Sequence, residues 1–191
     1  MLVHWGNLLG GCTNTIEAAW NPRLQCVELV VDGQPLGQLF KQDDSGVISP
    51  FARRFVHEAV ENSLEVYRGD FARRDDLLQG GEIELLICSV CGDLMCGSII
   101  ADLDIGAELV TWSRPRWWYF KDDDELDDDE PEEDLGVERW VFSLGDYQSA
   151  LAQIEGYLAR PGWRLIPDER GRLRRAVERR LGVESKPNPL W

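Results

Sequence analysis

Histidine is almost absent from this chain, which has only His4 and His57 among its 191 residues. A histidine general base, alone or in a Ser-His-Asp triad, therefore has little material to work with. The sequence also lacks a GxSxG turn, a phosphate-binding P-loop and the glycine-rich fingerprint of dinucleotide-binding proteins. Carboxylates are abundant, so a carboxylate-dependent hydrolase stays open as a hypothesis, although no pair of acids stands out.

Long hydrophobic runs are missing as well. The longest apolar stretches, such as ELLIC and WVF, fall far short of the roughly 18 residues that a membrane span needs. The first fifteen residues contain neither the basic region nor the apolar stretch of a secretory signal. We therefore expect no membrane partner and a cytoplasmic location.

Positive charge is in short supply. Acidic residues outnumber lysine and arginine 35 to 20, which gives a formal net charge of −15. Nucleic acids and anionic membranes would be repelled by such a chain, whereas a basic protein would be attracted. The composition thus favours a basic protein partner and argues against nucleic acid.

Most of the negative charge lies in one segment, residues 121–134, with eleven acids in the thirteen positions from 122 to 134. So many like charges cannot pack together, and we expect a solvated loop. The loop is either an inert insertion or an acidic surface that mimics a polyanion. A calcium loop is disfavoured, because the run lacks the spaced aspartates and the turn glycine that such a loop requires.

Seven segments have the apolar patterning of strands. They are residues 13–20, 23–31, 35–40, 82–88, 98–103, 107–113 and 137–143. Asp32-Gly33 predicts a tight hairpin turn between the second and third. The later strands follow one another closely, as in an antiparallel meander.

Three segments have helical patterning. The first begins at Ser49-Pro50, with Ser49 as N-cap, and continues to Tyr67. The second is capped by Asp146 and places an apolar stripe on one face as far as Leu158. The third covers about 168–181 and carries an arginine-rich face, which is either a nucleic-acid patch or a counterpart to acidic surface on the same chain or on a second copy in a homodimer.

These elements predict an α+β fold with a largely antiparallel sheet of about six or seven strands and two or three helices, mostly C-terminal. We expect a single domain over residues 1–182, with the acidic insertion at 121–134. We expect residues 183–191 to form a loosely held tail.

Cysteine is the residue type with the most informative spacing. The five cysteines, an odd number, do not fit a secreted disulfide framework. Cys88, Cys91 and Cys96 lie within nine positions, and the first pair has the spacing of a zinc knuckle. The candidates for a fourth ligand are Cys12, Cys26, His4 and His57. The alternatives to zinc are reduced cysteines packed around a loop, or redox chemistry; a thioredoxin-like site is excluded because no helix follows the motif.

Arginine and aromatic residues alternate just before the acidic run, in RPRWWYF. Such a stretch could stack on bases, pack in the core or anchor a protein partner. We hypothesise that these aromatics anchor a basic partner and that the neighbouring acids steer it. The candidate partner-binding residues are Trp117, Trp118, Tyr119, Asp122, Asp123, Asp124, Glu125, Asp127, Asp128, Asp129 and Glu130.

Three stretches together resemble a family of uncharacterised bacterial proteins. They are VVDGQPLGQLF, ELLICSVCGDLMCGSIIADLDIGAELVTW and WVFSLGDYQSALAQI, which together make up 55 of the 191 residues. The resemblance implies a strand, a Cys- and Gly-containing loop, a strand pair ending at Val-Thr-Trp and a Tyr-bearing helix. It implies no activity, and the acidic insertion and arginine-rich C-terminus depart from the family's pattern.

The sequence leaves three functional hypotheses. The first is a non-catalytic protein of the immunity or antitoxin kind, which neutralises a basic effector by direct binding. The second is a zinc-binding or regulatory module built on Cys88, Cys91 and Cys96. The third is the carboxylate-dependent hydrolase.

Overall fold

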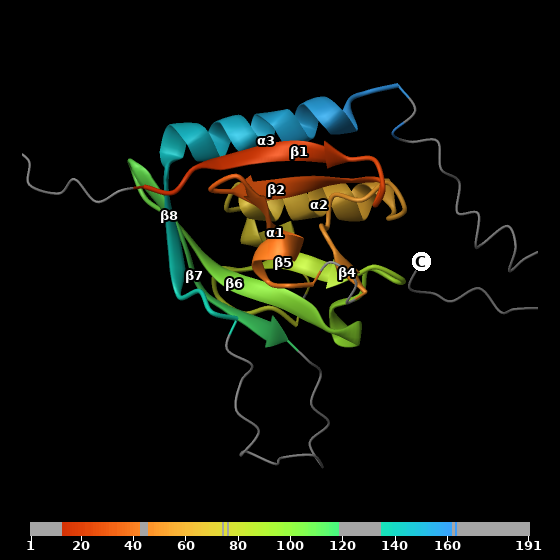
Figure 1. The fold of residues 1–191 in the computed structure, drawn as a ribbon, viewed down its shortest axis with the longest axis horizontal. Helices are drawn as coiled ribbons and strands as arrows, with labels where there is room; N and C mark the ends of the chain where they lie inside the picture. Colours follow the sequence, from red (N-terminus) through yellow and green to blue (C-terminus); the bar gives the residue numbers. More distant parts are fainter. Residues whose placement is uncertain are drawn as a thin grey trace, which may run out of the picture.

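A computed structural model gives the structure of residues 13–42, 46–73, 75, 77–118, 135–161 and 163. The predicted α+β class is confirmed. The strands form two antiparallel sheets, one of three strands in the order β1-β2-β3 and one of five in the order β4-β5-β6-β7-β8. In Figure 1 the three-stranded sheet lies between helix α3 and the five-stranded sheet.

The first sheet contains the predicted turn at Asp32-Gly33. Strands β1 (Ile16–Asn21) and β2 (Cys26–Val31) pair along their whole length, and β2 continues through the Asp32-Gly33 turn into β3 (Gln34–Pro35). The predicted return strand over residues 35–40 is wrong beyond Pro35, because Leu36–Leu39 forms the one-turn helix α1. In this turn Phe40 N donates to Leu36 O at 3.0 Å, and both side chains are buried.

The second sheet contains the predicted meander. Its strands are β4 (Val47–Ile48), β5 (Glu82–Cys88), β6 (Ser98–Ile105), β7 (Leu109–Trp118) and β8 (Arg139–Ser143). Strand β7 is longer than predicted, because the run beyond Ser113 remains paired with β6 after a register shift. Strands β7 and β8 pair with each other, so the acidic segment is the connection between two adjacent strands.

Helix α2 (His57–Tyr67) starts eight residues later than predicted. The Ser49 side chain is buried and donates to the Val27 carbonyl at 2.6 Å instead of capping a helix. The backbone that follows it runs along β2, where Val27 N donates to Phe51 O at 2.9 Å. Tertiary hydrogen bonds thus hold this segment extended and override its local helical signal.

Helix α3 (Leu144–Leu158) has the predicted apolar face, but its cap differs. Ser143 is the N-cap, and its hydroxyl accepts from Asp146 N at 3.0 Å, while Asp146 lies in the first turn. The 3₁₀ turns η1 (Phe71–Arg73) and η2 (Leu94–Cys96) complete the described elements. Within the described residues no helix has the length and apolarity to cross a membrane.

The core is aromatic at its centre. Trp112 is fully buried, and Tyr67, Trp140, Phe142 and Tyr147 meet its ring edge to face at centroid distances of 5.0–6.1 Å. Tyr147 Oη donates to the Tyr67 carbonyl at 2.8 Å, and Tyr67 Oη donates to the carbonyl of Glu84 at 2.6 Å. These contacts join α2, α3 and the second sheet.

The two sheets are also linked through the backbone before β1. Asn14 N donates to Val141 O at 2.7 Å, and Val141 N donates to Asn14 Oδ1 at 2.9 Å, so Asn14 lies against the edge strand β8. The helix predicted over 168–181, the tail at 183–191 and the acidic segment at 121–134 lie outside the described residues.

Candidate functional site

Cys88 and Cys91 lie on a tight turn at the end of β5. Gly92 N donates to Cys88 O at 2.9 Å, and Gly92 has a φ of 70°, a conformation that L side chains rarely adopt. The backbone N–H groups of Val90 and Cys91 point to the Cys88 sulfur and hydrogen-bond to it. These hydrogen bonds fix the backbone between the two cysteines.

Cys96 comes to the same place from the 3₁₀ turn η2. That turn is closed by hydrogen bonds from Cys96 N to Asp93 O at 3.2 Å and from Gly97 N to Leu94 O at 3.0 Å. Gly97, with a φ of 100°, then leads the chain into β6. The Sγ atoms of Cys91 and Cys96 are 3.1 Å apart, and the Sγ atoms of Cys88, Cys91 and Cys96 all lie within 4.8 Å of one another. We call this group the three-cysteine centre.

The thiols of Cys88 and Cys91 have altered acidity. Burial opposes ionisation of Cys88, but the backbone N–H groups of Cys91 and Val90 and the thiols of Cys91 and Cys96 stabilise its thiolate and lower its pKa. Burial and the sulfurs of Cys96 and Cys88 raise the pKa of Cys91 to about 12.

The spacing of the sulfurs suits a thiophilic ion. Tetrahedral Zn²⁺ with Zn–S bonds of about 2.3 Å holds its sulfur ligands about 3.8 Å apart. All three Sγ separations are at or below 4.8 Å, so each sulfur needs to move by about an ångström or less. Three protein thiolates leave one coordination position for water or another donor.

None of the fourth ligands predicted from the sequence joins this group within the described residues. Cys26 is buried elsewhere, and burial together with the Glu28 charge raises its pKa to about 12. His57 Nε2 lies 2.8 Å from Glu61 Oε1 on α2. Cys12 and His4 lie outside the described residues.

A neighbouring loop fixes the cysteine turn in place. Arg54 Nη1 donates to the carbonyl of Ser89 at 2.8 Å. The Phe55 ring lies so close to Gly92 that a Cβ there would come within 2.8 Å of it. Val90, at the tip of the turn, is 66% exposed. The centre is therefore supported from one side and open to solvent on the other.

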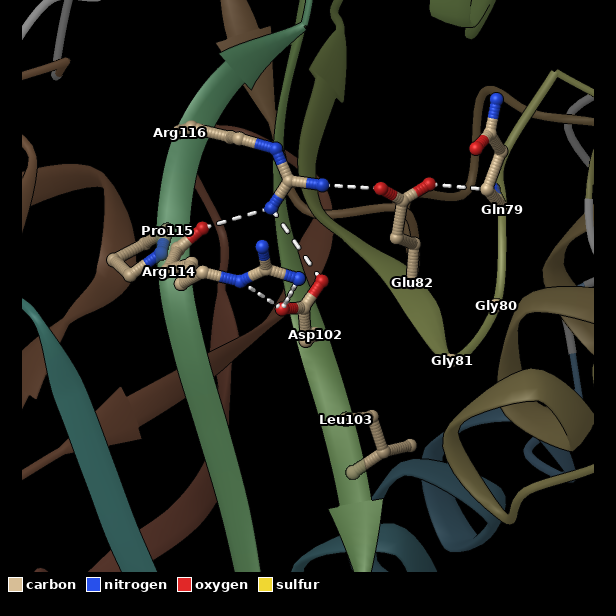
Figure 2. A pocket seen from close by; sticks show the side chains of 9 residues that line it. All are labelled: Gln79, Gly80, Gly81, Glu82, Asp102, Leu103, Arg114, Pro115 and Arg116. Carbon is tan, nitrogen blue, oxygen red and sulfur yellow. Dashed lines mark hydrogen bonds and ion pairs between the residues drawn. The ribbon is translucent and has the colours of Figure 1, made fainter.

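A second feature is a polar hollow of about 750 Å³, which we call the charged pocket. Figure 2 shows Arg116 between two carboxylates: it forms an ion pair with Glu82, and its Nη1 lies 3.5 Å from Asp102 Oδ1. Arg114 Nε donates to Asp102 Oδ2 at 2.5 Å. Each charge in the pocket thus has a partner of opposite sign, and the network links three neighbouring strands.

The sequence analysis did not predict this pocket. The available signal was the presence of charged residues, such as Glu82 and Asp102, within predicted strands. Its geometry depends on the register shift between Ile100 and Asp102 on β6. On the opposing strand Arg114 has a φ of 50°, which is uncommon for a residue with a side chain. The shift and the unusual backbone bring both arginines to Asp102.

The predicted aromatic anchors are only partly accessible. Trp117 is half-buried and packs against the main core, while Trp118 packs against the small cluster of Leu78, Leu94 and Ile100. This placement agrees with the alternative of core packing. Tyr119, Asp122, Asp123, Asp124, Glu125, Asp127, Asp128, Asp129 and Glu130 lie outside the described residues, so the partner-binding hypothesis stays a prediction.

One carboxylate has a strongly altered acidity. Burial, followed by the negative charges of Asp75 and Asp93, raises the pKa of Glu84 to about 8. Glu84 lines neither of the two hollows described for this molecule, whereas Glu82 and Asp102 do line one and are paired with arginine. The carboxylate-dependent hydrolase stays a prediction.

The resemblance to a family of uncharacterised bacterial proteins stays a prediction. No family model, no curated protein and no solved structure matches this chain.

Proposed function

We propose that this chain is a metal-binding protein and that Cys88, Cys91 and Cys96 hold one thiophilic ion, Zn²⁺ in the first instance. The observation that carries the proposal is the convergence of three sulfurs within 4.8 Å on a turn whose backbone N–H groups already stabilise a thiolate. Soft thiolate ligands favour zinc over magnesium or calcium, which prefer oxygen.

The ion has a structural role at this position. It fastens the turn after β5 to the turn before β6, and these two strands lie at the middle of the five-stranded sheet. Because Cys91 and Cys96 are exposed, the ion is also within reach of solutes and partner proteins. The site therefore suits a structural ion whose binding can be regulated better than it suits a permanently buried ion.

The experiment is a measurement of metal content in protein purified without chelator. We expect about one zinc per chain in the unmodified protein and a marked loss in the Cys88→Ser, Cys91→Ser and Cys96→Ser variants. Cys26→Ala is the matched control, because Cys26 is a cysteine outside the three-cysteine centre and should leave the zinc content unchanged. Absence of stoichiometric metal, or equal loss in the control, would contradict the proposal.

Binding of a basic effector is the second candidate. Its support is the position of residues 121–134, which connect the paired strands β7 and β8 and carry eleven acids within a chain of net charge −15. A connection between adjacent strands can hold a long insertion without disturbing the sheet. Such an acidic segment would steer a cationic protein toward this end of the sheet.

A further inference from the structure

A second hollow lies at the C-terminal end of α3. It has a volume of about 240 Å³, about the space of eight water molecules. Three segments that are distant in the sequence meet there: the end of β1, the loop after Ala52 and the residues that follow α3. The lining residues are Trp20, Arg53, Tyr157, Arg160, Pro161 and Trp163.

Aromatic rings make up much of its wall. Trp20 and Tyr157 are stacked, with centroids 6.4 Å apart and planes 26° apart. Trp163 meets Trp20 edge to face at 5.6 Å and is only 7% exposed, so it is anchored in the core. Trp20 and Tyr157 are half-buried and keep part of their surface accessible to a ligand. Two accessible rings held by a buried third form a rigid, flat-sided surface.

Two guanidinium groups complete the lining. Arg160 Cζ lies 4.0 Å from the centroid of the Tyr157 ring, a cation–π contact that holds the guanidinium against the aromatic wall. Arg53 is fixed from the other side, with Nη1 donating to Gln25 Oε1 at 3.2 Å and its backbone N donating to Gln25 O at 2.9 Å.

Among the residues that the structure describes, the lining contains no carboxylate, although acids outnumber bases in the chain by 35 to 20. The hollow therefore combines an aromatic wall with positive charge in an otherwise acidic molecule. Its volume is below the range of about 300–1,000 Å³ for drug-sized ligands. A nucleotide is too large for it, whereas one or two fused rings with a single anionic group fit.

We propose that this hollow, the aromatic–arginine pocket, binds a small planar anion, an aromatic ring system that carries a carboxylate. The ring would stack against Trp20 and Tyr157, and the carboxylate would accept hydrogen bonds from the guanidinium groups of Arg160 and Arg53. The planar fork of arginine matches the geometry of a carboxylate. Contacts with the arginines and the aromatic rings would therefore replace the contacts that the ligand makes with water. This binding activity is independent of the three-cysteine centre.

The test is calorimetric titration of the purified protein with 2-naphthoate and with its neutral analogue 2-naphthamide. We expect one naphthoate per chain and at least tenfold weaker binding of the amide. Arg160→Gln should weaken naphthoate binding at least fivefold. Arg139→Gln is the matched control, because Arg139 is exposed on β8 and does not line the pocket, and it should change affinity less than twofold.

Three results would overturn the proposal: no saturable binding, equal affinity for acid and amide, or equal effects of the two arginine substitutions. Arg160 also stands one residue beyond the C-cap of α3, where a cation stabilises the helix end. A purely structural role would lower the melting temperature of Arg160→Gln and leave naphthoate affinity unchanged. The Cys88→Ser variant should lose zinc but bind naphthoate with unchanged affinity. The two proposals can therefore fail independently of each other.

Discussion

Zinc should stabilise the folded protein, and its removal should lower the melting temperature by a measurable amount. The turn that carries Cys88 and Cys91 is already ordered, since its backbone hydrogen bonds and the positive φ of Gly92 are in place. Little conformational rearrangement therefore opposes binding. Nearly all of the binding free energy should appear as added stability of the folded state.

The magnitude follows from mass action. At a free zinc concentration of about 100 times the dissociation constant, an ion that binds only the folded state adds about 2.7 kcal/mol. For a chain of 150–250 residues, each kcal/mol changes the melting temperature by about 2–4 °C. We therefore expect the zinc-loaded protein to melt roughly 5–11 °C above the metal-free protein.

The assay is thermal unfolding followed by circular dichroism in zinc-buffered solution and again after treatment with a chelator. The Cys26→Ala control should show the full difference between the two conditions. The Cys96→Ser variant should show little or none, because one of three ligands is missing. Identical melting curves for unmodified protein with and without zinc would refute the argument that the preformed turn converts metal binding into stability.

Four further predictions concern the fold and the partner. The Glu84→Gln variant should be about as stable as the unmodified protein at pH 4 but more stable at pH 8.5 by urea unfolding. The gain should be up to about 5 kcal/mol, since the folded-state pKa of about 8 exceeds the unfolded value near 4.3. The stability tied to the bound proton is lost as pH rises between these two values. Tyr67→Phe should cost about 1–2 kcal/mol in the same assay by leaving a buried carbonyl without its donor, and an unchanged midpoint would contradict this. Ser143→Ala should cost about 1 kcal/mol through the lost hydrogen bond from Asp146 N, with recovery in Ser143→Asp. Deletion of residues 121–134 should abolish capture of a basic partner in a pull-down from the native host, and capture that survives the deletion would remove the second candidate function.

The sequence predicted the elements whose signals are local. Strand β5, from Glu82 to Cys88, has the predicted bounds, and the apolar stripe of α3 faces the core as its 3.6-residue period requires. Ser49 shows where this approach failed. Its cap signal is genuine, but the hydroxyl binds the carbonyl of Val27, 22 residues away, and no local pattern reports such a partner.

The candidate sites also differ in how far local sequence signals predicted them. The spacing of Cys88 and Cys91 predicted their convergence, whereas the approach of Cys96 depends on the 3₁₀ turn η2 and two closing hydrogen bonds. The aromatic–arginine pocket was not predicted at all. Trp20 and Tyr157 are separated by most of the chain, so their stacking is a property of tertiary packing alone.

The contact between the first strand and the last helix has a consequence for synthesis of the chain. Ala18 N donates to the side chain of Gln153, 135 residues later, at 2.9 Å. At about 5–20 residues per second, a ribosome needs roughly 7–27 s to make the intervening chain. During that interval the N-terminal hairpin has neither α3 nor the edge strand β8 to cover it. The nascent hairpin is therefore exposed to chaperones and to wrong strand partners until α3 has been synthesised.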